Sequence, residues 1–311
     1  MGKFEEGQLS LDYDVPRNDN FLRHNTFMFI EDLSISKYSI KDEYLSISLE
    51  TNLEEEITNF LANNVTTFRF RNNYWSRRSN FNDELLELIE TISNQLINKG
   101  FCVFEKVYER EKLVRLKVVM GEYKIKRNNI IQIIPDDVAA KIKSNTKVFI
   151  PKEKCFVLEF PKRLCSSKEY LNILKKMVEI DGKDPMLSIL NPSNLSKVSG
   201  YDAMKHRYKL DLTLRQLTKK LSWHHREQFS SRDKFSDYYS TLRSLKFRRT
   251  KIILLNHIFD FIELIIEEIF DKTTLDISYN KTLEDIDKII KDYEKGIFTN
   301  DLHLKIIKEF M

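Results

Sequence analysis

Residues 80–126, with the sequence NFNDELLELIETISNQLINKGFCVFEKVYEREKLVRLKVVMGEYKIK, are the stretch that decides the fold. Four apolar residues in its first half recur at i, i+4, i+7 and i+11, a spacing that places them on one face of a helix. They are Leu85, Ile89, Ile92 and Leu96. We therefore predict a helix over residues 82–99, with Asn82 as its N-cap and Gly100 as the left-handed residue that ends it.

Beyond Gly100 the pattern becomes that of strands, because aromatic and β-branched residues replace the helical spacing. We predict one strand over residues 101–109 and a second over residues 112–120, joined by a polar turn at Arg110 and Glu111. Further extended segments are expected at residues 122–126, 130–135 and 148–160.

The order of helix, glycine, hairpin and extended segment resembles the central part of phage portal proteins. In that family a helix ending in Leu-x-x-x-Gly enters a strand that carries a glutamate, and a hairpin then leads to a strand that ends in proline. The residues that carry the resemblance are Leu96, Gly100, Glu105, Leu116, residues 131–135 and residues 150–161. The resemblance covers residues 80–161. It implies a homo-oligomeric ring, contact with double-stranded DNA and packaging proteins, and a structural role in virion assembly.

The chain before residue 80 is more polar. We predict a strand or two within residues 27–47, and a short helix from Asn52, as its cap, to Asn63. After the hairpin region, Ser166 and Glu169 have the spacing of a capping box that opens another helix.

The C-terminal third is predicted to be helical throughout, because no proline follows Pro192 and glycines are rare. A loop-rich boundary is expected near residues 181–200. The expected helices are residues 201–230, 234–247, 251–270, 282–295 and 300–310. The sequence thus predicts an α+β fold, with an α+β domain at residues 1–190 built around the helix–glycine–hairpin core and a helical domain at residues 191–311.

The net charge of +4 hides an uneven distribution. Residues 1–60 hold 5 basic and 13 acidic residues, a net charge of −8, and residues 252–311 hold 7 and 13, a net charge of −6. In contrast, residues 61–80 carry 4 basic and no acidic residues, and residues 201–251 carry 14 and 5, a net charge of +9. Such asymmetry favours polyanionic partners for the basic regions; ordinary variation among solvated helix faces is the alternative.

Two basic regions are candidate contacts for nucleic acid. In residues 68–78 arginines alternate with aromatic residues that stack on bases; the alternative is a strand that buries Phe68 and Phe70. Residues 243–251 form the densest positive run, and on a helix they cover more than one face. Their alternative is a junction between helices, or a contact with the acidic residues 252–311. The candidate residues are Arg69, Arg71, Arg77, Arg78, Arg243, Lys246, Arg248, Arg249 and Lys251.

Catalytic motifs are absent from the sequence, which has no Gly-rich phosphate loop, His-Glu-x-x-His or Cys-x-x-Cys. Glu122-x-Lys124 matches the Glu-x-Lys half of a metal-dependent nuclease site, for which Glu105, Glu109 or Glu111 could supply the second carboxylate; the alternative is an ordinary strand with alternating charged residues. His257 is expected to be a satisfied interior histidine beside Asp260. We expect no catalytic residue, no metal and no cofactor. The three cysteines, Cys102, Cys155 and Cys165, are expected to be free thiols in a reducing compartment.

The main functional hypothesis is therefore a portal-like structural protein that forms a homo-oligomeric ring for the passage of double-stranded DNA. Its alternative is a nucleic-acid-binding protein of a phage-defence or mobile-element system, which uses residues 68–78 and 201–251. A third hypothesis is an interaction protein whose helical third binds a partner. No membrane span is predicted, so a cytoplasmic or virion location is expected.

Overall fold

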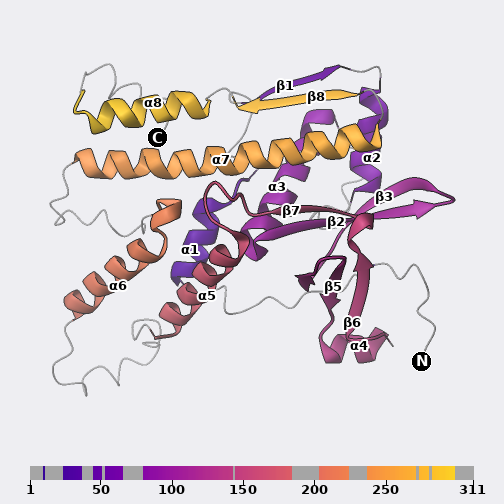
Figure 1. Ribbon diagram of the computed structural model, residues 1–311, viewed down its shortest axis with the longest axis horizontal. Coiled ribbons are helices and arrows are strands. Elements are labelled where there is room, and N and C mark those ends of the chain that lie inside the picture. Colours follow the sequence, from indigo (N-terminus) through magenta and orange to yellow (C-terminus); the bar gives the residue numbers. More distant parts are fainter. Residues whose placement is uncertain are drawn as a thin grey trace.

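The computed structural model describes residues 10, 24–36, 45–50, 53–65, 80–142, 144–183, 203–223, 237–270, 273–279 and 282–297 (Figure 1). The helices are α1 (His24–Leu33), α2 (Glu54–Asn64), α3 (Phe81–Lys99), α4 (Asp136–Ile142), α5 (Ser167–Lys183), α6 (Ala203–Leu217), α7 (Asp237–Ile269) and α8 (Leu283–Glu294). The strands are β1 (Leu45–Glu50), β2 (Phe101–Glu109), β3 (Lys112–Val118), β4 (Glu122–Ile125), β5 (Asn129–Ile133), β6 (Lys147–Pro151), β7 (Cys155–Glu159) and β8 (Thr274–Tyr279). The predicted α+β fold is confirmed, with helices α7 and α8 in the C-terminal region.

Helix α3 forms where its apolar period predicted it, but its N-cap is Asn80, so the prediction of Asn82 was wrong. The Asn80 side chain accepts a hydrogen bond from the Asp83 backbone N–H at 2.8 Å, and its extended backbone lets the helix begin at Phe81. Gly100 ends the helix with a φ of 71°, as predicted. A Cβ at Gly100 would lie 3.3 Å from the side chain of Leu171, so close packing as well as backbone conformation favours glycine.

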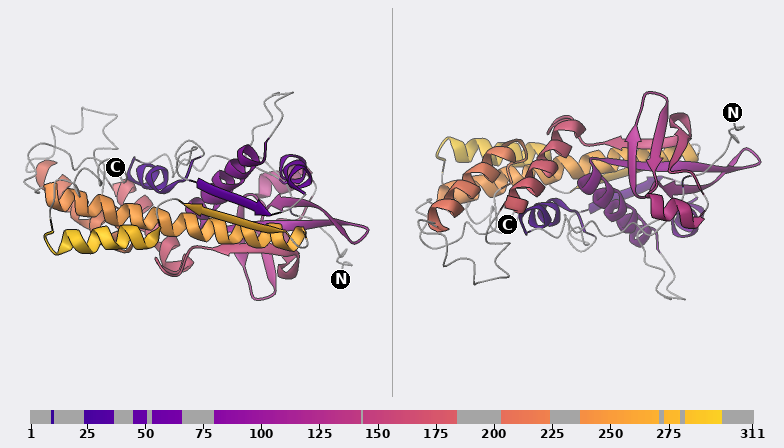
Figure 2. Two further views of the ribbon diagram at one scale, coloured as in Figure 1. Left: turned by 90° about the horizontal axis from the view of Figure 1, so that it is seen from above. Right: turned by 90° about the horizontal axis from the view of Figure 1, so that it is seen from below.

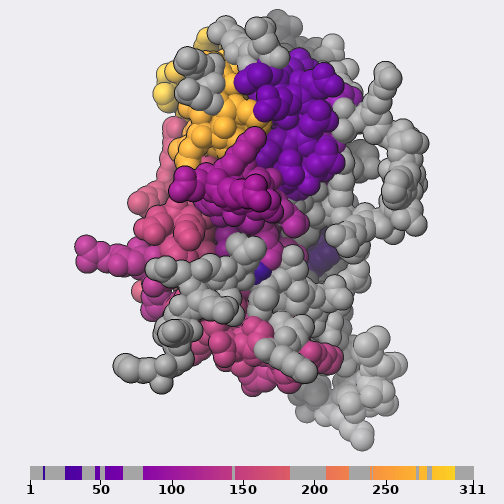
Figure 3. All heavy atoms as spheres, turned by 90° about the vertical axis from the view of Figure 1, so that its right-hand side faces the viewer, coloured from indigo at the N-terminus to yellow at the C-terminus, as the bar shows by residue number. Residues whose placement is uncertain are grey.

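Two small antiparallel sheets follow α3. The predicted hairpin is confirmed: β2 pairs with β3, and β7 returns to pair with the other side of β2, in the order β3-β2-β7. Strands β4, β5 and β6 form the second sheet, in sequence order. The hairpin projects away from α7 in Figure 1, and Figure 3 views this end, where α2 in violet, the magenta hairpin region and the pink second sheet all reach the surface.

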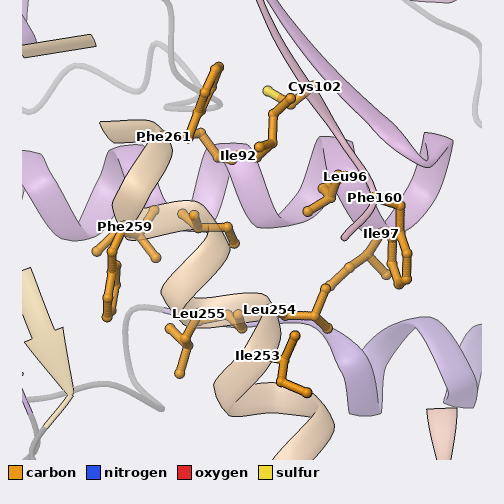
Figure 4. Packing of buried hydrophobic residues seen from close by; sticks show 14 of the residues in the cluster. Ile92, Leu96, Ile97, Cys102, Phe160, Ile253, Leu254, Leu255, Phe259 and Phe261 are labelled. Atoms are coloured by element: carbon orange, nitrogen blue, oxygen red, sulfur yellow. The ribbon is translucent and has the colours of Figure 1, made fainter. Parts of the chain in front are cut away.

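The main core lies where α7 crosses α3 and the first sheet. Buried residues of α7 meet buried residues of α3 and β2, such as Ile92, Leu96 and Cys102 (Figure 4). Helix α7 is one continuous helix, so the prediction of separate helices at residues 234–247 and 251–270 was wrong. The charged residues between them continue the helix because none of them is a proline or glycine that would end it.

The helical C-terminal third contains a strand that was not predicted. Residues of β8 alternate in burial, with Leu275 and Ile277 inside, which is the period of a half-buried strand. Strand β8 pairs antiparallel with β1 in a two-stranded ribbon along α7, and the Ile277 N–H donates to Glu263 of α7 at 3.0 Å (Figures 1 and 2). Helix α8 forms within the predicted range and begins at Leu283, with Thr282 as the N-cap that forms a capping box with Asp285.

The N-terminal region departs in part from the prediction, because residues 24–33 form helix α1, whereas strand β1 begins at the end of the predicted range. Asp181 of α5 explains why α1 is stable. Its carboxylate accepts hydrogen bonds from the backbone N–H groups of Asn25 at 3.3 Å and Thr26 at 2.9 Å, and from both of their side chains. A buried carboxylate thus satisfies the first donors of α1. Asp181 itself lies in a helix that continues to Lys183, where a loop was predicted.

Several predictions fall outside the described residues: the cap at Asn52, the Arg-aromatic stretch 68–78, the boundary near residue 190 and the helix at residues 300–310. The predicted capping box of α5 is confirmed, because the Ser166 Oγ accepts from the Glu169 N–H and the Glu169 carboxylate accepts from the Ser166 N–H. One buried apolar cluster includes residues from α1, α2, α3, the first sheet, α5, α7, β8 and α8, on both sides of residue 190.

Candidate nucleic-acid interface

The five basic residues of α7 that the sequence singled out do not share one side of the helix. Successive residues are rotated by about 100°, so Lys246 and Arg249 lie on one side and Arg248 and Lys251 on the opposite side, with Arg243 between Lys246 and Lys251. All five side chains are partly buried. The two groups therefore face different neighbours and have different chemistry.

Lys246 and Arg249 face helix α8. The Lys246 ammonium lies 2.6 Å from Glu294, and the Arg249 guanidinium pairs with the Asp287 carboxylate. This is the contact with the acidic segment 252–311 that the sequence left open as the alternative to nucleic-acid binding. Each of these four side chains is between 32% and 45% exposed, so water screens both ion pairs.

Arg243 lies in a second environment, near Arg215 of α6. Burial lowers the pKa of the Arg243 guanidinium from its usual value, and the nearby positive charge of Arg215 lowers it further. The two guanidinium groups are thus close enough for their charges to interact. Guanidinium groups donate paired hydrogen bonds to phosphate oxygens, so a phosphate is an anion of the kind that arginines bind.

Lys251 lies about two turns further along α7. The pKa of its ammonium is lowered to about 8, mainly by burial and also by the nearby Arg248, while Asp32 of α1 opposes the effect. Asp32 also accepts a hydrogen bond from the Trp223 indole N–H at 2.9 Å, so it is held in place next to this positive group. Trp223 is itself fixed by edge-on contact with Phe29. The site thus combines α1, α7 and the end of the α6 segment, which we define as residues 203–223, helix α6 with the turn that follows it.

Sequence reasoning missed Arg215, Asp32 and Trp223 as members of this site. Asp32 and Trp223 are 191 positions apart, and no local pattern in the sequence brings such residues together. The other four candidates, Arg69, Arg71, Arg77 and Arg78, lie outside the described residues.

The residues proposed for a nuclease site are spread over different surroundings. Glu122 and Lys124 are exposed on β4, Glu109 and Glu111 are exposed at the tip of the hairpin, and Glu105 is buried on β2. Within the part of the chain that the structure describes, no three His, Cys, Asp or Glu side chains are grouped so that they could hold a metal ion.

The surroundings of His257 and of the three cysteines fit structural roles and not catalytic ones. A ring nitrogen of His257, Nε2, lies 2.8 Å from the carbonyl oxygen of Glu159, rather than pairing with Asp260 as expected. All three cysteines are free thiols, as predicted. Burial raises the pKa of Cys155 to about 12, that of Cys165 to about 11, and that of Cys102 far above its usual range. Thiols in this state are poor nucleophiles at neutral pH.

No protein-family model matches the sequence, and no curated protein matches it. Among the described helices, none is both long and apolar enough to cross a lipid bilayer.

Proposed function

We propose that the protein is a portal-like structural subunit that assembles into a homo-oligomeric ring around double-stranded DNA. The observation that carries the proposal is the contiguity of residues 80–161, the segment with the portal resemblance. Helix α3 enters β2 through Gly100, β2 and β3 form the hairpin, and β7 pairs back onto β2 beside Glu105. The resemblance rests on the order of these segments along the chain. In the structure the same segments also pack together as one unit.

In this proposal the part of α7 that carries Arg243, Arg248 and Lys251 contacts the DNA backbone. Contacts of basic side chains with phosphates are electrostatic and need no base sequence. Lys246 and Arg249 face α8, where they pair with Glu294 and Asp287, and they provide the comparison.

The test of the ring is the mass of the purified full chain in solution, measured by light scattering at low and high salt. We expect a large closed assembly of about a dozen subunits. Head-to-tail interfaces between identical subunits produce such a ring when the rotation between neighbours closes. A monomer or dimer under both conditions, with and without double-stranded DNA, would overturn the proposal.

A second candidate function is nucleic-acid binding without a ring, in a phage-defence or mobile-element system. The grouping of Arg215 with Arg243 and of Arg248 with Lys251 favours it, because both pairs bring like charges together. Under this function the chain binds DNA as a monomer or dimer, so the light-scattering result separates the two candidates.

The DNA contact itself is tested with two matched variants and a short duplex. Replacing Arg243, Arg248 and Lys251 together with alanine should weaken binding and reduce the slope of log affinity against log salt by about 0.9 for each lost phosphate contact. Replacing Lys246 and Arg249 with alanine is the control, and it should leave the slope nearly unchanged. An equal loss of DNA affinity in both variants would show that the total charge, and not the position of Arg243, Arg248 and Lys251, determines binding.

A further inference from the structure

Two buried charged residues face each other on the first sheet. Glu105 of β2 and Lys117 of β3 are register partners, and only 3% and 7% of their surfaces are exposed. Their neighbours on the same face, Val103 and Val119, belong to the small core under the second sheet. An opposite-charge pair in such a position has lost most of its water, so it needs polar partners from the protein.

The partner of both residues is the backbone of Ser10. The Ser10 N–H donates to Glu105 Oε2 at 2.8 Å, and the Lys117 ammonium donates to the Ser10 carbonyl oxygen. Ser10 is 1% exposed, and it lies 95 positions from Glu105 and 107 from Lys117 in the chain. The two side chains therefore hold one peptide residue by its donor and its acceptor.

This arrangement imitates the edge of a β-strand. In extended chain the N–H and C=O of one residue point to the same side, and a neighbouring strand offers them one acceptor and one donor. Here the acceptor is a carboxylate and the donor an ammonium, and hydrogen bonds to charged groups are stronger than those between neutral groups.

The side chain of Ser10 takes no part in this recognition. Its Oγ is buried and has no hydrogen-bond partner among the residues that the structure describes. Recognition therefore rests on the backbone, which every residue except proline can provide in full.

We propose that Glu105 and Lys117 form a binding site for peptide backbone in an extended conformation, which Ser10 of this chain fills. The site selects for an extended backbone with a free N–H and not for a particular side chain. The residues around Ser10 of a second copy of this chain compete with Ser10 for the same two groups. This function is independent of ring formation and of DNA binding.

The test uses the full chain and a fluorescent peptide that corresponds to residues 5–15. In a Ser10→Pro variant of the full chain the internal ligand lacks its N–H, so the labelled peptide should bind this variant at least about ten-fold more tightly than it binds the wild-type chain. Fluorescence anisotropy measures both affinities, and thermal unfolding shows whether the variant is folded.

Matched peptides then identify what the site recognises. A peptide with Ser10→Ala should bind the variant chain as well as the natural peptide does, whereas a peptide with Ser10→Pro should bind about ten-fold more weakly. Adding Lys117→Met to the Ser10→Pro chain should abolish binding. The proposal is overturned if the natural peptide binds neither chain, if the proline peptide binds as well as the natural one, or if the alanine peptide loses as much as the proline peptide.

If the Ser10→Pro chain does not fold, hydrogen exchange on the wild-type chain replaces it. Excess unlabelled natural peptide should speed exchange of the Ser10 amide by displacing it, while the peptide with Ser10→Pro should not. Unchanged exchange with both peptides would equally overturn the proposal.

Discussion

Residues 252–269 of α7 are apolar on most sides, whereas residues 237–251 carry five basic side chains, although both belong to one uninterrupted helix. The apolar half lies among α3, the first sheet and the β1–β8 ribbon, and its apolar side chains are mostly buried. The basic half lies between α8 and the α6 segment, and most of its side chains are only partly buried.

The two halves of α7 differ in how much they contribute to stability. Each fully buried aliphatic side chain contributes about 1.5–3 kcal/mol of transfer free energy, whereas a half-exposed ion pair contributes about 0–1 kcal/mol. The apolar half therefore anchors the helix, and the basic half holds charged groups at fixed positions at little gain in stability. Charged groups that are kept at fixed positions without stabilising the fold are candidates for binding.

The largest expected effect comes from breaking the apolar half. Ile262 is fully buried, and Ile262→Ala should lower the free energy of unfolding by about 2–5 kcal/mol because it leaves a cavity in the main core. Leu264→Ala is the control from the same half, since Leu264 is 51% exposed, and it should cost much less. Urea unfolding measures both. Equal losses would show that the core does not lie where α7 crosses α3.

A smaller change, an increase in the free energy of unfolding, is expected from replacing Lys251, where the two halves of α7 meet. The pKa of Lys251 is lowered to about 8 in the folded protein, so the unfolded chain binds its proton more tightly. Protonated Lys251 thus disfavours folding at pH 7, and Lys251→Met should raise the free energy of unfolding there by about 1–2 kcal/mol.

The stability difference between Lys251→Met and the wild-type protein should also depend on pH. Between pH 8 and the usual lysine pKa of 10.5, the unfolded chain holds a proton that the folded protein has lost, so Lys251 makes wild-type stability rise with pH. The advantage of Lys251→Met should therefore shrink from pH 7 to pH 10. The pKa of Lys99 is also lowered to about 8, but Lys99 acts equally in both proteins and cancels in the difference. A constant difference across this range would contradict the prediction.

The parts of the fold that could be predicted from the sequence have local causes. The apolar period of α3, the stop at Gly100 and the alternation of β2 and β3 each lie within about twenty residues, so their signals are complete in the sequence. Even there the cap was misplaced by two residues, because Asn80 and Asn82 are both good caps and the geometry of the chain selects between them.

The rest could not be predicted because its causes are distant in sequence. Strand β8 pairs with β1 across more than two hundred positions, and α1 is stabilised by the carboxylate of Asp181. The candidate site shows the same limit. The sequence identified the basic residues of α7, but only the fold shows that Arg249 meets Asp287 and that Lys251 lies near Asp32.

One buried hydrogen bond connects the basic half of α7 to the turn after α6. The buried hydroxyl of Thr250 donates to the carbonyl oxygen of Leu221 at 3.0 Å, which links α7 to the turn that carries Trp223. Thr250→Val should lower the free energy of unfolding by about 1 kcal/mol, because this carbonyl loses a buried donor. Thr213→Val is the matched control, since the exposed Thr213 bonds only within its own helix at 2.8 Å. A cost no larger than that of the control, measured by thermal unfolding, would show that this link does not hold α7 in place.

The smallest effects are expected for the ion pairs with α8. A double-mutant cycle of Arg249→Ala and Asp287→Ala should give a coupling free energy of about 0.5–1 kcal/mol, and one of Lys246→Ala and Glu294→Ala about 0.2–0.5 kcal/mol. The first pair is expected to be stronger because both side chains are 32% exposed, against 40% and 45% in the second, and because a guanidinium can donate to both oxygens of a carboxylate. Both couplings should fall when the unfolding measurements are repeated in 1 M salt, where the screening length is about 3 Å. Couplings above 2 kcal/mol that persist in salt would mean that the pairs with α8 stabilise the fold as the apolar half does, and that the contrast between the two halves of α7 is wrong.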